Sequence, residues 1–304
     1  MMKISCTIGG WKGDGNFQFL RDCGFDACEY PVGGLINNFF DEPTDDGLKE
    51  RCLQLAGFAK EAGLIINQTH GWFGGHPGEY TLDQIIAHEI KAIKATYWLG
   101  AKYVVVHPYI LPGRKYDLKE KEAYDISLEL YKGLIPTLEE YDIICCIENM
   151  FAGDWEHKHM CPTICSHADE MARLCDELNE ISNHFGICLD SGHGLVIGDD
   201  PVEMVYELGD RIKVLHTHDN DGIDDLHTYP FSAHASKYNF KPIRMDWHAY
   251  LRALEDVGYK GTLNFEIGYI GPKDLAYAGY EYLAEIGKYL ANYRDEYAKE
   301  KAEQ

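Results

Sequence analysis

Short β-like runs alternate with longer helical patterns along all 304 residues of the chain. Alternation at this spacing, with no linker or low-complexity tract to divide it, implies a parallel sheet, and eight repeats imply closure into a barrel. We therefore predict one α/β domain over residues 1–304, a (β/α)8 barrel, with an open doubly wound sheet as the alternative. The expected strands are Lys3–Ile8, Ala27–Tyr30, Leu64–His70, Tyr103–His107, Ile143–Glu148, Phe185–Asp190, Ile212–His218 and Leu263–Ile267.

Helix-terminal signals and loop lengths support this division. Thr81 and Gly100 suit the two ends of a helix over Thr81–Leu99, and Asp45 and Gly63 suit those of a helix over Asp45–Ala62. Two unusually long connections, residues 150–165 and 219–246, follow the fifth and seventh expected strands. Because a barrel keeps its active site at this end of its strands, we expect both segments to act as lids or binding loops.

Acidic residues outnumber basic ones, with 50 Asp and Glu against 28 Lys and Arg, for a formal net charge of −22. Proteins that bind nucleic acids usually carry the opposite sign, so we expect no nucleic-acid partner. The same charge repels phosphate-bearing ligands at long range and favours a neutral substrate.

Targeting and redox signals indicate the cytoplasm. The N-terminus lacks the apolar stretch of a secretory signal, and no stretch approaches the roughly 18 apolar residues of a membrane span. Cys6, Cys145, Cys146 and Cys188 lie within apolar strand runs, where reduced thiols behave as small hydrophobic groups. We expect a cytoplasmic protein with reduced cysteines and no membrane partner.

Six of the expected strands carry, at or within two residues of their carboxyl ends, a residue of a type that binds metals. A parallel barrel gathers these strand ends around one mouth, so residues far apart in the sequence become neighbours. Imidazole and carboxylate groups gathered in this way form sites for divalent metal ions. The six residues are His70, His107, Glu148, Asp190, His216 and Glu266.

Four of them, Glu148, Asp190, His216 and Glu266, make the strongest metal site. Each alone could cap or pair within its own loop, but three carboxylates buried together without a cation would be very costly. Three hard oxygen donors and one imidazole suit Mn²⁺, Mg²⁺ or Co²⁺ better than a structural zinc. We expect one divalent ion, with Mn²⁺ the leading candidate and Mg²⁺, Co²⁺ and Zn²⁺ as alternatives.

Several strand-end motifs together carry a family resemblance. In this order, on successive strands, the motifs resemble the sugar phosphate isomerase/epimerase superfamily of xylose-isomerase-like barrels, over essentially the whole chain. The resemblance implies one divalent ion on the four residues above and a substrate contact from His193. The motifs are Ile147-Glu148-Asn149, Leu189-Asp190-Ser191-Gly192-His193, His216-Thr217-His218-Asp219 and Phe265-Glu266.

The chemistry that the resemblance implies is proton abstraction next to a carbonyl, through an enediolate. A metal ion stabilises the developing negative charge, and a positioned glutamate accepts the proton. We expect Glu148 and Glu266 to face each other across the mouth as acid and base. Return of the proton to the opposite face of the carbon is epimerisation, and its return to the adjacent carbon is isomerisation.

A second layer of residues resembles the trinuclear-zinc pattern of the apurinic-site endonucleases, which share this barrel. It adds His70, His107, Asp225 and His227 to His193 and the first four residues. The net charge argues against a DNA substrate. We interpret His70 and His107 as groups that bind or orient a substrate, with a second metal ion as the other reading for these four residues.

The surrounding positions suggest how a substrate is held. Trp11 and Trp72 lie in loops after the first and third expected strands, where aromatic rings stack on sugars or simply pack the rim. Glu29 closes the second expected strand, and we expect it to make a structural hydrogen bond. Residues 228–245 replace a short Pro- and Gly-rich turn of many relatives with a longer aromatic and basic segment, which puts substrate identity by analogy in doubt. This segment could also reach a neighbouring subunit.

The sequence thus favours a metal-dependent isomerase or epimerase that acts on a small sugar or keto-sugar. A lyase on the same scaffold is the main alternative, because deprotonation beside a keto group can also expel a leaving group, as in inosose dehydratases and C-glycoside deglycosidases. An apurinic-site endonuclease and a non-catalytic sugar-binding protein are the remaining readings. A homo-oligomer or an accessory subunit is compatible with all of them.

Overall fold

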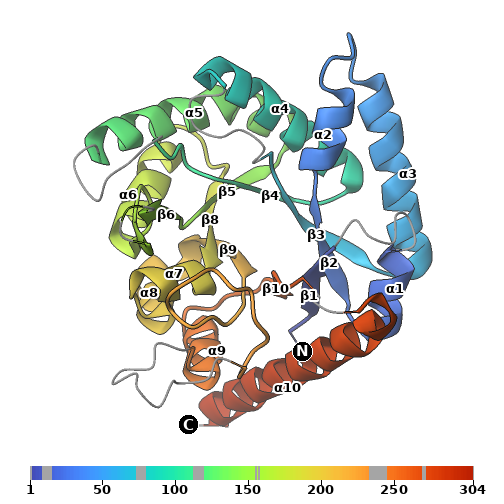
Figure 1. Cartoon of the computed structure of the whole chain (residues 1–304), viewed down its shortest axis with the longest axis vertical. Helices are drawn as coiled ribbons and strands as arrows, with labels where there is room; N and C mark the ends of the chain where they lie inside the picture. Colours follow the sequence, from blue (N-terminus) through green and yellow to red (C-terminus); the bar gives the residue numbers. More distant parts are fainter. Residues whose placement is uncertain are drawn as a thin grey trace.

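Eight parallel strands form the centre of the computed structural model, with helices around them as an outer ring (Figure 1). The structure describes residues 2–8, 16–72, 80–111, 120–154, 156, 158–232, 245–268 and 272–303. The strand order is β10-β1-β2-β3-β4-β5-β8-β9. A parallel bridge between Thr217 and Phe265 joins the two ends of this order and closes the ring. The predicted (β/α)8 barrel is therefore confirmed.

The predicted strands agree with the structure to within one or two residues at each end. The barrel strands are β1 Ile4–Thr7, β2 Ala27–Pro31, β3 Ile65–His70, β4 Tyr103–Val106, β5 Ile144–Glu148, β8 Phe185–Asp190, β9 Ile212–His216 and β10 Leu263–Phe265. The helices are α1 Asn16–Cys23, α2 Gly33–Phe39, α3 Asp46–Ala62, α4 Leu82–Leu99, α5 Glu120–Tyr141, α6 Ala168–Asn179, α7 Ser191–Ile197, α8 Pro201–Leu208, α9 Trp247–Asp256 and α10 Ala276–Glu303, with short 3₁₀ turns at Gly209–Arg211 and Lys273–Leu275.

Three local elements go beyond the sequence prediction. Helices α2 and α7 are short and rich in glycine, so their apolar spacing is too brief to mark a helix. The long connection over residues 150–165 contains an antiparallel hairpin of β6 Phe151–Asp154 and β7 His159–Pro162. This hairpin follows the carboxyl end of β5 and makes that connection a small sheet rather than an open loop.

Helix caps follow the sequence signals with one exception. Thr81 forms a full capping box with Gln84 at the start of α4, and Gly100 adopts a left-handed conformation at its end. Asp45 precedes α3 but makes no capping hydrogen bond. Its carboxylate instead binds the ammonium groups of Lys91 and Lys94, at 2.9 and 2.6 Å. Asp45 thus ties α3 to α4 on the outside of the barrel.

The barrel interior is divided into an apolar and a polar side. Val105, Cys146, Cys188 and Val214 pack together on the side of β4, β5, β8 and β9. The opposite side, from β10 through β1 and β2 to β3, carries wholly buried polar side chains, which are Ser5, Glu29, Gln68 and Asn264. Barrel interiors are normally filled by branched aliphatic residues, so these polar groups need partners within the core.

All ten cysteines are buried and none forms a disulfide, in agreement with the expectation of reduced thiols. Within the described residues, no helix is long and apolar enough to cross a membrane.

A buried carboxyl beside β3 gives the fold a pH-dependent stability. Burial raises the pKa of Glu89 on α4 to about 8, while a hydrogen bond from the Trp72 amide opposes this rise. A folded-state pKa above the unfolded value costs stability as pH rises from about 4.5 to 8, since only the unfolded chain then ionises freely. With about 1.4 kcal/mol per pKa unit, the cost reaches up to about 5 kcal/mol.

We therefore expect Glu89→Gln to unfold at higher urea concentration than the parent protein at pH 9, and with little difference at pH 4.5. The neutral amide keeps an acceptor for the Trp72 amide and has no charge to bury. Urea unfolding curves across this range measure the effect, and a difference that is the same at every pH would contradict it.

Candidate metal centre at the mouth of the barrel

The four predicted ligands meet around one ring nitrogen, Nδ1 of His216. This fully buried side chain ends β9. Its Nδ1 lies 2.7 Å from Glu148 Oε1, 3.2 Å from Glu266 Oε2 and 3.9 Å from Asp190 Oδ2. The strands bring these groups together because their carboxyl ends reach one level, as in the pairing of Asp190 with His216. The centre is thus built from β5, β8, β9 and the residue after β10.

His70 and His107 form a second group with the other oxygen of Glu148. Nε2 of His107 lies 2.9 Å from Glu148 Oε2, and Nε2 of His70 lies 3.5 Å from it. The two Nε2 atoms are 3.1 Å apart. Ligands of a tetrahedral ion at about 2.1 Å stand roughly 3.4 Å from one another. These distances therefore suit a shared cation as well as a shared proton.

His193 and His227 present their Nε2 atoms to a third group around Asp225. Nδ1 of His193 donates to the Asn149 carbonyl at 2.7 Å, and Nδ1 of His227 donates to the Glu266 carbonyl at 2.5 Å. Each ring thereby keeps Nε2 for the centre, at 3.6 and 2.8 Å from Asp225 Oδ2. Backbone carbonyls fix the orientation of metal-binding histidines in this way.

His218 belongs to the third group, although the sequence prediction left it out. Its ring is fully buried, stacks on His227 with centroids 4.0 Å apart, and has no hydrogen bond at either nitrogen within the described residues. Its Nε2 lies 3.3 Å from Asp190 Oδ1 and 3.6 Å from Asp225 Oδ1. The sequence does contain a signal for His218. It follows His216 by two residues, and side chains two residues apart in an extended strand point to the same face.

Two further residues, Glu29 and Cys188, reach the centre without having been assigned to it. Glu29 on β2 is fully buried and lies 2.6 Å from Nε2 of His216, so its expected structural hydrogen bond is made to a predicted ligand. The sulfur of Cys188 is near enough to Glu148 and His216 for the three to hold one ion. Neither position has a motif of its own, and only the closed barrel shows that β2 and β9 face each other across the core.

The two predicted tryptophans are placed differently. Trp11 lies outside the described residues. Trp72 is 6% exposed, its indole donates to Asn37 at 2.7 Å, and its ring stacks on His88. This packing accounts for Trp72 without a substrate, and a role for either tryptophan in substrate binding stays a prediction.

The electrostatic environment separates the two candidate catalytic glutamates. Burial raises the pKa of both side chains. For Glu148 the positive charge of His216 and hydrogen bonds from His107 and His216 outweigh burial and hold the pKa well below its usual range. For Glu266 burial prevails, and the nearby carboxylates of Glu148, Glu29 and Asp190 raise the pKa further. Two carboxyl groups with divergent pKa values are a common arrangement for a general acid and a general base.

The polar atoms that lack partners support a cation. Oδ2 of Asp190 and Oδ1 of Asp225 are buried and accept no hydrogen bond from the residues that the structure describes. Buried carboxylate oxygens without a donor are rare because each loses its hydration without compensation. Together with oxygen and nitrogen donors from three neighbouring groups, these atoms fit a divalent ion.

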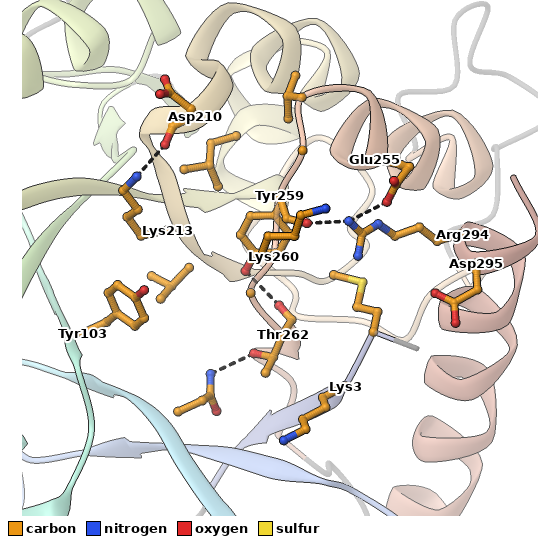
Figure 2. Close-up of a pocket in the computed structure, with 17 residues that line it drawn as sticks. Lys3, Tyr103, Asp210, Lys213, Glu255, Tyr259, Lys260, Thr262, Arg294 and Asp295 are labelled. Carbon is orange, nitrogen blue, oxygen red and sulfur yellow. Dashed lines mark hydrogen bonds and ion pairs between the residues drawn. The ribbon is translucent and has the colours of Figure 1, made fainter. Parts of the chain in front are cut away.

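The cavities near the barrel ends differ in size. One of about 200 Å³ lies at the mouth, beside His227 and the loop after β9. A larger one of about 790 Å³ lies at the opposite end, where the strands begin, and is lined by Lys213, Tyr259 and Arg294 among others (Figure 2). The candidate metal-binding groups described above lie at the mouth, so the larger of the two cavities is not at the candidate site. The predicted loop over residues 228–245 lies mostly outside the described residues.

The fold and the mouth together define an α/β barrel with a carboxylate–imidazole centre at the carboxyl ends of its strands. The chain belongs to the xylose isomerase-like TIM barrel family, whose model matches residues 17–286.

Curated relatives match only parts of the chain. A mannonate dehydratase from Oceanobacillus iheyensis is 32% identical over 120 residues, which are 39% of this chain and 32% of the relative. A probable endonuclease 4 from Mycoplasmoides gallisepticum is 29% identical over 178 residues, or 58% of this chain and 50% of the relative. The chain spans about a quarter to about half of the length of the curated relatives it matches.

Solved structures match over nearly the full length. A D-tagatose 3-epimerase-like protein superposes with a TM-score of 0.71 at 18% identity, covering 99% of this chain and 100% of the other. The 3-keto-D-glucoside 4-epimerase of E. coli gives 0.68 at 17% identity, covering 94% and 100%. An IolI protein with a zinc atom gives 0.68 at 17% identity, covering 97% and 99%. At these identities the likeness establishes the fold.

The first turn of α7 is shaped around His218. A methyl group added at Gly192 would overlap the His218 ring, which is buried and cannot move aside. We expect Gly192→Ala to lower the free energy of unfolding by about 1–3 kcal/mol through overpacking. Gly194→Ala on the same helix meets the sulfur of the flexible Met204 side chain at 3.0 Å and Pro201 at an ordinary contact distance of 3.6 Å, and is the matched control. Equal stability of the two variants in chemical denaturation would contradict this packing.

Proposed function

We propose that the protein is a metal-dependent sugar isomerase or epimerase that removes a proton from the carbon next to a carbonyl. The observation that carries this proposal is the placement of Glu148 and Glu266 beside His216 Nδ1, at 2.7 and 3.2 Å, with Asp190 next to them. The family and the epimerases among its structural neighbours support the same reading.

The proposed resident ion is a single Mn²⁺ held by Glu148, Asp190, His216 and Glu266. Three carboxylates and one imidazole suit a hard divalent ion, and Mg²⁺, Co²⁺ and Zn²⁺ are the alternatives. When bound, the ion supplies Lewis-acid stabilisation of negative charge on the substrate oxygens. The zinc atom in the structurally similar IolI protein supports a divalent ion in this fold.

We assign the transfer of the proton to two glutamates of this chain. Glu148, whose pKa is held low, is ionised at neutral pH and suits the role of base. Glu266 lies 3.2 Å from His216 Nδ1, and we assign it the role of acid that returns the proton. His193 is held by the Asn149 carbonyl with Nε2 toward the centre, and we assign it a substrate hydroxyl. The side chains of Glu148 and His193 are 1% and 7% exposed, which limits the access of bulk water to the reacting groups.

The second candidate is a lyase that uses the same first step. After proton removal, a leaving group on the next carbon departs instead of the proton returning. The mannonate dehydratase among the relatives favours this reading, because dehydration is such an elimination. The two candidates differ in their products, so one assay separates them.

The charge of the chain counts against the endonuclease reading. The probable endonuclease 4 relative is similar over half its length, and the histidines of the second layer lie at the mouth of this barrel. A formal charge of −22 would oppose the approach of DNA, whose binding depends on basic residues.

Incubation with candidate sugars in deuterated water tests the proposal. We expect the Mn²⁺-loaded protein to incorporate deuterium from solvent into a recovered ketose, inosose or 3-keto-glycoside, and expect a chelator to abolish the exchange. Glu148→Gln and Glu266→Gln should each slow it by about 10²–10⁴-fold, since each loses a proton-transfer group.

Mass spectrometry and NMR of the recovered sugar give the readout. Loss of water or of an aglycone would support the lyase. No turnover of any of these sugars with any divalent ion, alongside unchanged sugar binding in the two variants, would contradict catalysis altogether.

A further inference from the structure

A continuous series of hydrogen-bonded polar side chains runs through the barrel core to His216. Nδ2 of Asn67 lies 2.8 Å from both Thr262 Oγ1 and Gln68 Oε1. Nε2 of Gln68 donates to Glu29 Oε2 at 2.5 Å, and the same oxygen accepts from Nε2 of His216 at 2.6 Å. We call the four residues Thr262, Asn67, Gln68 and Glu29 the core polar chain.

The core polar chain begins at the opposite end of the barrel. Thr262 and Asn67 line the cavity at the start of the strands, where Figure 2 shows the hydrogen bond to Thr262. The pairing of β2 with β3 skips Asn67, because Cys28 pairs with Ile66 and Glu29 with Gln68. This irregularity leaves Asn67 out of the pairing with β2, and its side chain donates to that of Gln68.

Both carboxylate oxygens of Glu29 accept hydrogen bonds in this arrangement. Oε1 accepts from Thr7 Oγ1 at 3.1 Å, and Oε2 accepts from Gln68 and His216. The side chain is fully buried, and among the described residues no lysine or arginine forms an ion pair with it. A carboxylate buried in a barrel core is costly, and its retention under an imidazole needs an explanation.

The ring orientations of the other histidines indicate why Glu29 is kept beside His216. His193 and His227 are fixed by backbone carbonyls at Nδ1, which leaves Nε2 for the centre. His216 is reversed, with Nδ1 toward Glu148 and Nε2 toward the core. At this Nε2, Glu29 takes the place that the carbonyls hold at the other two rings. A carboxylate partner also makes the ring a better electron donor than a carbonyl does.

We propose that Glu29, held in place by Gln68, is a positioning residue that fixes the tautomer and orientation of His216 for a divalent ion at Nδ1. This inference rests on the proposed metal site and adds to it a determinant of affinity outside the ligands. Glu29 contacts Nε2 of His216, whereas we place the ion at Nδ1, so we expect Glu29 to affect metal binding through the orientation of the ring.

Substitution of Glu29 by glutamine isolates the negative charge. In Glu29→Gln the side-chain oxygen can still accept from Gln68 and His216, while the new amide nitrogen faces Thr7 Oγ1, which is itself able to accept. Packing and hydrogen bonds are therefore kept. We expect Glu29→Gln to weaken Mn²⁺ binding by about 10–100-fold. It should also shift the visible absorption bands of the Co²⁺-loaded protein, with little change in the unfolding temperature of the metal-free protein.

Calorimetric titration with Mn²⁺ and absorption spectra with Co²⁺ make the test. Glu89→Gln is the matched control, because Glu89 is another buried glutamate, and its carboxylate accepts from the Trp72 amide rather than from His216. Its affinity and spectrum should equal those of the parent. Gln68→Met, which removes the hydrogen bond to Glu29 from the other side, should weaken binding several-fold and carries the test if Glu29→Gln does not fold.

The outcomes separate this inference from the proposed function. A parent protein that binds neither Mn²⁺ nor any other divalent ion overturns the proposed metal site. A parent that binds Mn²⁺, with unchanged affinity and Co²⁺ spectrum in Glu29→Gln, or in Gln68→Met if Glu29→Gln is unfolded, overturns the positioning role alone and leaves Glu29 as a structural group.

Discussion

The structure depends on one electrostatic constraint, the burial of several carboxylates around a single imidazole. Glu29, Glu148 and Asp190 are at most 1% exposed, and all three lie within 4 Å of a nitrogen of His216. Negative charges brought so close together repel each other in a medium that screens them poorly. Positive charge must be supplied there, by protonated histidines in the metal-free protein or by a cation. The stability of the mouth therefore depends on the same positive charge that the proposed chemistry requires.

The barrel meets this constraint through the division of its interior. The apolar side, with Val105, Cys146 and Val214, supplies ordinary packing. The polar side supplies a hydrogen bond from Gln68 to Glu29, on the side of Glu29 that faces the start of the strands. A carboxylate could not be kept under His216 in a core of branched aliphatic residues alone. The buried polar residues of β1, β2, β3 and β10 thus support a site that lies nearer the mouth of the barrel.

Sequence reasoning reached the fold and the main candidate ligands because both depend on local signals. Strand–helix alternation is periodic, and Glu148, Asp190 and His216 each end a strand. What depends on contact across the barrel could not be read in this way. The sequence predicts a hydrogen bond for Glu29 but cannot name its partner, His216, because β2 and β9 come together only in the folded barrel. The sequence does not predict the hairpin of β6 and β7, because its strands, Phe-Ala-Gly-Asp and His-Met-Cys-Pro, are too short and too mixed in character to show a strand pattern.

We propose above that Glu148, Asp190, His216 and Glu266 bind one divalent ion. Anomalous diffraction at the manganese edge, from crystals grown with Mn²⁺, tests it directly. We expect a single strong peak within coordination distance of His216 Nδ1 and of an oxygen of each carboxylate. A map without a peak at this position, with His216 still hydrogen-bonded directly to Glu148, would contradict it.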